Sequence, residues 1–143
     1  MDTKRLVIGT IAGGVTYFVA GYLIFDLGFG DFYVANRPPG FNRAVPMEWA
    51  VALGSLSLGA LLALGVLSRG APTIPGGFVT GAVMNFLLWF GVDFTLYGIN
   101  EGRNLTLAVI DPLLELIRGG IAGVVIAAVL ARVPKSAAIR PAA

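Results

Sequence analysis

Polar side chains recur at helical spacing inside two otherwise apolar stretches of the sequence. In one stretch, Asp111, Glu115 and Arg118 follow one another at intervals of four and three residues and therefore share one helix face. The other stretch places a polar or amphipathic residue at every fourth position, at Asn85, Trp89, Asp93 and Tyr97. A charge inside an apolar helix is costly unless it is paired or hydrated, so these residues are candidates for a functional site.

These residue types are suited to holding an ion, a proton or a polar ligand. If the two polar faces meet, Arg118 can pair with Asp93 or with Glu115, and the remaining acid is left for a ligand, a proton or a water-filled pocket. The predicted ligand or ion pocket comprises six residues: Asp93, Asp111, Glu115, Arg118, Asn85 and Trp89.

A structural role for the same residues is the alternative. Asp111 precedes Pro112, which is typical of a helix start with an N-cap aspartate and proline at the first position. Glu115 would then lie in the first turn, where the helix dipole favours an acid, and Arg118 would pair back to it. In that case the cluster only fixes the order of the helices.

The composition excludes several classes of site. The chain contains neither cysteine nor histidine, which rules out disulfides, thiolate metal sites and the commonest general base. It has no phosphate-binding glycine loop or dinucleotide fingerprint, and its basic residues flank apolar spans instead of forming a nucleic-acid-binding patch. We therefore expect no cofactor, no metal site and no nucleic-acid partner, and we favour a non-enzymatic role.

One enzymatic motif does occur. The segment Gly28-Phe29-Gly30-Asp31 matches the G-x-G-D signature of intramembrane aspartyl proteases, in which a second aspartate, here Asp93, would help to activate a water. Such enzymes use more spans and a Tyr-Asp motif that this chain lacks, and Asp31 lies beyond the predicted helix end. A hydrolase is therefore only the third hypothesis.

The elements that position these residues are long and apolar. Of the 143 residues, 57% are hydrophobic and 13% charged, and the mean hydropathy is +0.84, which is typical of a membrane protein. Each stretch has close to the ~20 residues that cross a bilayer as a helix. The predicted spans cover residues 6–29, 49–67, 78–97 and 112–133. We predict an all-α membrane protein with four transmembrane helices in an up-down-up-down bundle over residues 1–133, followed by a flexible cytoplasmic tail over residues 134–143.

The charge distribution predicts the orientation of these spans. One side carries an excess of basic residues, namely Lys4, Arg5, Arg69, Arg132, Lys135 and Arg140. The positive-inside rule places that side, with both termini, in the cytoplasm. Seven of the eight acidic residues fall on the opposite side, in or beside two connections. We expect a protein of the inner (cytoplasmic) membrane with a polar pocket near the outer leaflet.

The two halves of the sequence resemble each other. Residues 49–67 and 112–133 align without a gap, which pairs Glu48 with Asp111 and Arg69 with Arg132. One interpretation is a duplicated two-helix unit. The other is that any two membrane helices share apolar residues with charges at their ends, and both interpretations stay open.

The segment from Asp93 to Asn100, followed by Leu105 to Asp111, resembles part of some small bacterial integral membrane proteins with four helices and an aspartate-rich third helix. The resemblance implies the architecture only. Small multidrug transporters have a similar size and helix count. However, they carry an essential glutamate in the first helix, where this chain has no acid before Asp26.

The leading functional hypothesis is a non-catalytic accessory, assembly or ligand-binding subunit with a polar pocket near the outer leaflet. It rests on two observations. The sequence lacks cysteine, histidine and the common catalytic motifs, and small residues such as Gly77 and Gly81 recur at four-residue spacing, which allows close helix contacts. The alternative is a cation- or proton-coupled transporter or channel that uses the same acids. The expected partners are the lipid bilayer and either further copies of the chain or a larger membrane complex.

Overall fold

The computed structural model describes residues 2–70 and 72–134, and the predicted tail from residue 135 onward lies outside the described residues. Within the described part the chain is helical and contains no strand. The elements are α1 (Thr3–Gly21), the π-helix η1 (Tyr22–Gly28), α2 (Gly30–Asn36), α3 (Glu48–Ser68), α4 (Ile74–Ile99) and α5 (Leu105–Arg132).

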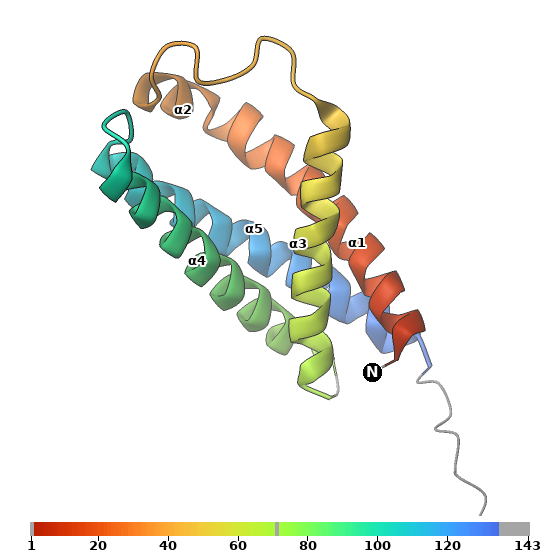
Figure 1. The fold of residues 1–143 in the computed structure, drawn as a ribbon. Helices are drawn as coiled ribbons and strands as arrows, with labels where there is room; N and C mark the ends of the chain where they lie inside the picture. The colour runs from red at the N-terminus through yellow and green to blue at the C-terminus, as the bar shows by residue number, and fades with distance from the viewer. Residues whose placement is uncertain (1, 71, 135–143) are drawn as a thin grey trace, which may run out of the picture.

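Four helical segments are long and apolar enough to cross a membrane: Thr3–Gly28, which joins α1 to η1, and α3, α4 and α5. Consecutive long helices run in opposite directions (Figure 1). Their connections define two ends of the molecule. The loop end holds the connections over residues 29–47 and 100–104, and the terminal end holds the start of α1 and the short link between α3 and α4.

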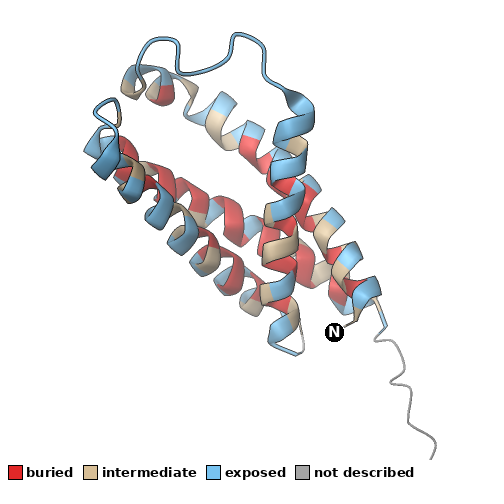
Figure 2. Ribbon diagram, viewed as in Figure 1, coloured by how far each residue is buried: buried red, intermediate tan, exposed pale blue. Residues whose placement is uncertain are grey.

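The helices associate as two pairs that diverge. α1 packs along α3, α4 packs along α5, and the pairs meet chiefly where α1 crosses α5 (Figure 1). Buried residues line the faces that the helices turn toward one another, whereas the outward faces are exposed (Figure 2). α3 and α4 approach each other at the terminal end and separate toward the loop end.

The fourth long helix begins earlier than the sequence pattern indicates. Its N-cap is Asn104, whose side chain accepts a hydrogen bond from the backbone N–H of Leu107. Asp111 therefore lies inside the helix and is not an N-cap, and the helix continues through Pro112. Proline removes one N–H donor from the helix, yet the helical conformation is continuous on both sides of it. The first connection is partly helical, because α2 occupies its first part.

Glycines bring the helices of each pair into backbone contact. On α4 and α5, an added Cβ at Gly77 or Gly81 would collide with the backbone of Gly123 or Gly119. On α1 and α3, an added Cβ at Gly59 would meet the carbonyl oxygen of Thr10 at 2.7 Å. Small residues permit such close approach where lipid provides no hydrophobic drive. The terminal half is completed by an apolar core that includes Leu62, Ala63, Val66, Ile126 and Leu130.

We predict that Gly81→Ala lowers the thermal stability of the protein, because the new methyl group meets backbone that cannot move aside. The expected loss is about 1–3 kcal/mol, the usual cost of overpacking. Thermal unfolding in detergent, followed by tryptophan fluorescence, measures it. Gly91→Ala on the same helix is the matched control, because a Cβ there has no neighbour within 4 Å and alanine favours a helix. Equal melting temperatures for the two variants would contradict the expectation.

Candidate functional site

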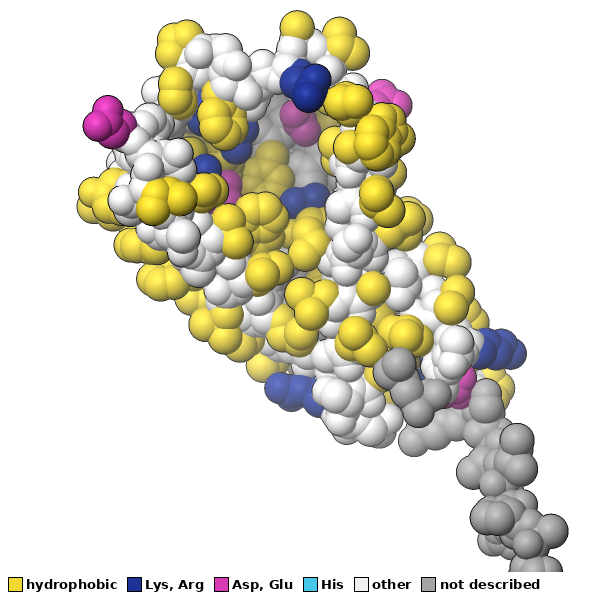
Figure 3. All heavy atoms as spheres, viewed as in Figure 1, with side chains coloured by type: hydrophobic (Ala, Val, Ile, Leu, Met, Phe, Trp, Pro, Cys, Tyr) yellow, Lys and Arg dark blue, Asp and Glu magenta, His cyan; other side chains and the backbone are white. Residues whose placement is uncertain are grey.

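The divergence of the helix pairs leaves a charged hollow at the loop end. Figure 3 shows this hollow on the face between α3 and α4, with basic and acidic side chains inside a mostly apolar rim. Two cavities make up this cleft. They share the ring of Phe25 as a wall, and each is lined by both acidic and basic residues.

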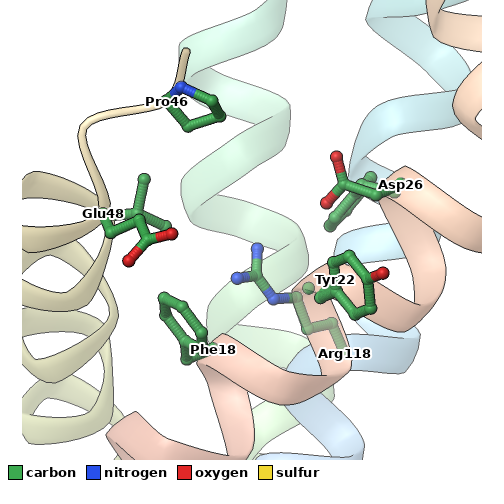
Figure 4. A pocket seen from close by; sticks show the side chains of 9 residues that line it. Phe18, Tyr22, Asp26, Pro46, Glu48 and Arg118 are labelled. Atoms are coloured by element: carbon green, nitrogen blue, oxygen red, sulfur yellow. The ribbon is translucent and has the colours of Figure 1, made fainter.

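The first cavity, which we call the Arg118 cavity, has a volume of about 450 Å³. In Figure 4 the guanidinium of Arg118 extends into it between Glu48 of α3 and Asp26 of η1. The remaining lining residues are Phe18, Gly21, Tyr22, Phe25, Pro46 and Val51. Gly21 makes room for Arg118, because an added Cβ would lie 2.7 Å from the guanidinium carbon.

The π-helix η1 supplies Tyr22, Phe25 and Asp26 to this cavity. π-helices are rare, and they occur mostly as short insertions in α-helices, frequently at functional sites. η1 follows α1 directly, beyond the Tyr17 carbonyl oxygen that accepts from Arg118, and it borders the cleft.

Arg118 is fixed by neighbours on two helices. Its Nε donates to the carbonyl oxygen of Tyr17 at 2.9 Å, and its Nη1 donates to Oε1 of Glu115 at 2.9 Å. The guanidinium also stacks on the Tyr17 ring, 3.5 Å from the ring centroid, and lies 5.2 Å from that of Phe25. A buried cation is therefore neutralised, hydrogen-bonded and stacked at once, which is what makes its burial tolerable.

Beneath the cleft, Glu115 joins three helices through its second oxygen. Oε2 accepts from the Tyr17 hydroxyl at 2.6 Å and from Asn85 Nδ2 at 2.7 Å. The Tyr17 hydroxyl in turn accepts from Trp89 Nε1 at 3.1 Å. Because Tyr17, Asn85 and Glu115 are almost fully buried, this network forms the polar floor of the cleft, and each member has partners.

The second cavity, the Asp93 cavity, has a volume of about 270 Å³. Its charged lining residues are Arg37, Asp93, Arg103, Asp111 and Glu115, and its apolar lining consists of Phe25, Phe41, Trp89 and Leu96. Asp93 is completely buried and forms an ion pair with Arg103 through Oδ1. Its other oxygen, Oδ2, has no hydrogen-bond partner among the described residues.

α2 and the connection over residues 100–104 cover one side of this cavity. Tyr33 on α2 donates a hydrogen bond to Oδ1 of Asp111, and Asn104 Nδ2 donates to Oδ1 of Asn36 at 3.1 Å. Burial, and then the hydrogen bond to Asp111, raises the pKa of Tyr33 above its ordinary value. Tyr33 therefore stays a neutral donor, and α2 is held against the start of α5.

The structure brings the six predicted pocket residues into one region. Trp89, Asp93, Asp111 and Glu115 line the Asp93 cavity, Arg118 lines the neighbouring cavity, and Asn85 supports the floor. Of the two partners considered for Arg118, it pairs with Glu115 and not with Asp93. Tyr97, predicted on the face of Asn85, is exposed instead.

The predicted pocket did not include several further polar residues of the cleft. These are Tyr17 in the floor, Asp26 and Glu48 in the Arg118 cavity, and Arg37, Arg103 and Tyr33 at the Asp93 cavity. Arg103 could have been predicted from the sequence, because a buried Asp93 needs a cation and Arg103 is the next basic residue along the chain. Asp31 of the G-x-G-D segment lies exposed on α2 and lines neither cavity, so it does not join Asp93. Over residues 2–70 and 72–134, no group of three or more acidic side chains could hold a metal ion.

No protein-family model, curated protein or solved structure matches the chain.

We predict that Tyr17→Phe destabilises the protein by about 1–2 kcal/mol, the range for hydrogen bonds between membrane helices. The substitution leaves Trp89 Nε1 without its acceptor and removes a donor from Glu115. Chemical or thermal unfolding in detergent gives the change. Tyr97→Phe is the control, because that side chain is exposed. If both variants unfold alike, the floor network does not stabilise the fold.

Proposed function

We propose that the four long helices span a membrane, with the loop end on the outer side, and that the chain is a non-catalytic protein that binds a polar ligand in the cleft. Exposed apolar side chains on all four helices support immersion in lipid, among them Val15, Leu53, Leu87 and Ile117. The excess of Lys and Arg at the terminal end supports the orientation, with both termini in the cytoplasm.

The observation that carries the binding proposal is Asp93. Its carboxylate is completely buried in a long apolar helix, lines a cavity, and keeps one oxygen without a protein partner. The ion pair with Arg103 compensates the charge through Oδ1, but a buried carboxylate oxygen without a hydrogen bond still costs free energy. A ligand that donates a hydrogen bond or a positive charge to Oδ2 would remove that cost.

Binding is favoured over a continuous pore by the terminal half of the molecule. Beneath Tyr17 and Glu115, the helices are in backbone contact at glycines and enclose a buried apolar core. Water and ions would need this packing to separate before they could pass. The cleft reaches the loop end and the face between α3 and α4, which suits a ligand that enters from the outer leaflet or the outer solution.

We predict that protein purified from its own host membranes in mild detergent carries a bound molecule that depends on Asp93. Native mass spectrometry should find an additional mass on the wild type. It should be lost in Asp93→Asn, because the amide removes the charge that holds the ligand. Asp31→Asn is the matched control, since Asp31 is exposed and lines neither cavity.

The same spectra test the accessory interpretation. A second protein chain, or a second copy of this chain, would identify a membrane complex in which the cleft serves assembly. Bare wild-type protein, or an additional mass that Asp93→Asn retains, would contradict the binding proposal.

A proton- or cation-coupled transporter is the second candidate. It is favoured by the buried Glu115 network, whose members Tyr17 and Asn85 could pass or stabilise a proton, and by the irregular η1 segment beside it. In this case the present conformation would be open only toward the loop end.

For that candidate, we predict pH-dependent flux in reconstituted vesicles, monitored with a trapped pH-sensitive dye. Glu115→Gln and Asp93→Asn should abolish the flux because each removes a titratable group from the cleft, whereas Asp31→Asn should leave it unchanged. If vesicles with the wild-type protein hold a proton gradient as long as protein-free vesicles do, the transporter hypothesis is ruled out.

A further inference from the structure

The unpartnered polar atoms of the cleft specify what a ligand must offer. Apart from Nε of Arg5 at the terminal end, the buried side-chain atoms without hydrogen-bond partners in the described residues belong to Asp93, Arg37 and Arg103. These three residues line the same cavity. A complementary ligand therefore needs a donor for the Asp93 carboxylate and an acceptor for the two guanidinium groups.

The two arginines form an incomplete anion site. Arg37 and Arg103 line both the Asp93 cavity and the adjoining groove of about 340 Å³ beneath Pro38 and Gly102. Arg37 is stacked 4.5 Å from the Tyr33 ring centroid and donates from Nη1 to Asn42 at 3.1 Å. Burial chiefly, and also the neighbouring charge of Arg37, lowers the pKa of Arg103, while Asp111 opposes the shift. An anion placed between the two guanidinium groups would relieve their repulsion, and phosphate oxygens suit them geometrically.

Once the ion pair between Arg118 and Glu115 is set aside, two acids and two arginines line the Asp93 cavity. The other acids of the cleft, Asp26, Glu48 and Glu101, line the neighbouring cavities and are exposed. A ligand with a net charge would leave one charge uncompensated beside the buried carboxylate of Asp93. A zwitterion would preserve the balance while supplying both the donor and the acceptor.

The apolar walls fit a ligand that continues into lipid. Trp89, Leu96 and Phe41 line the Asp93 cavity, and Phe25 connects it to the Arg118 cavity, which Phe18 and Val51 border. The hollow opens on the face between α3 and α4 (Figure 3). A chain attached to a polar headgroup could leave the cleft sideways between these helices.

We propose that the cleft binds a headgroup in which a primary ammonium is joined to a phosphate by a short linker. The ammonium donates to Oδ2 of Asp93, and the phosphate lies between Arg37 and Arg103. Because Asp93 and Arg103 are already in contact, the two ligand groups must be close together, as they are in phosphoethanolamine. This chemistry has two sources: an aminophospholipid of the outer leaflet or a free phosphoethanolamine-type compound. The inference rests on the proposed binding function.

The test compares lipids that differ in one group. Delipidated protein in detergent is offered phosphatidylethanolamine, phosphatidylcholine or phosphatidylglycerol with the same acyl chains, and lipid retained per protein is measured by native mass spectrometry. Phosphatidylethanolamine should be retained at least about tenfold better, since choline has no N–H and glycerol has no charge to offer the buried carboxylate. Asp93→Asn should remove this preference, and Arg37→Gln should weaken retention. Asp31→Asn should behave as the wild type.

A soluble-ligand arm distinguishes the sources. Free phosphoethanolamine that raises the melting temperature of wild-type protein, without preferential lipid retention, would assign the chemistry to a soluble compound. Equal retention of the three lipids, with no effect of phosphoethanolamine, overturns the inference. If Asp93→Asn fails to fold, the comparison of lipids on the wild type and on Arg37→Gln decides the question.

The inference can fail while the proposed function stands. That outcome is a host-derived bound molecule that depends on Asp93 but lacks an amine or a phosphate. A second outcome contradicts both the binding function and the headgroup inference. In that outcome the protein carries no bound molecule from its host and binds none of the three lipids or phosphoethanolamine.

Discussion

Backbone contact at glycines is the constraint on which the rest of the structure depends. Gly77 and Gly81 bring α4 against α5, and Gly59 brings α3 against α1, at distances that no side chain would allow. The two pairs formed in this way meet chiefly where α1 crosses α5, and helices that cross at an angle separate away from the crossing. The tight terminal half and the open loop half are therefore two results of the same packing, and the cleft needs no additional element to hold it open.

The polar floor determines how deep that opening reaches. Glu115 accepts hydrogen bonds from α1 and α4 and pairs with Arg118 on its own helix, so three helices are tied together at the level where the apolar core begins. The buried polar side chains of this floor network are all hydrogen-bonded, either to a neighbouring helix or within their own helix. In contrast, the carboxylate of Asp93 and the Nε atoms of Arg37 and Arg103 above it are left incomplete. The floor network has its hydrogen-bond partners, whereas the Asp93 cavity contains polar atoms without them. For this reason we place ligand binding in the cavity above the floor.

Much of this arrangement follows from the sequence, and the exceptions have physical causes. Asp111, Glu115 and Arg118 return to nearly the same helix face because seven residues make almost two full turns. Steps of four residues drift by about 40° each on an α-helix, so Tyr97 rotates out of the face that Asn85 and Asp93 share, and it is exposed. The partners of Asp93 and Asp111 were missed because they come from the two connections. The positions of those connections depend on tertiary packing and not on periodicity.

The ion pair between Asp93 and Arg103 has a consequence for biogenesis. Arg103 follows α4 directly in the chain, so a nascent hairpin that ends there already contains the counter-ion for the aspartate. Glu115 and Arg118 likewise neutralise each other within a single turn of α5. Asp93 and Glu115 thus each acquire a cation from their own stretch of chain, before any other helix has to be in place. In the proposed membrane topology, insertion into the bilayer and assembly of the cleft can then proceed as separate steps.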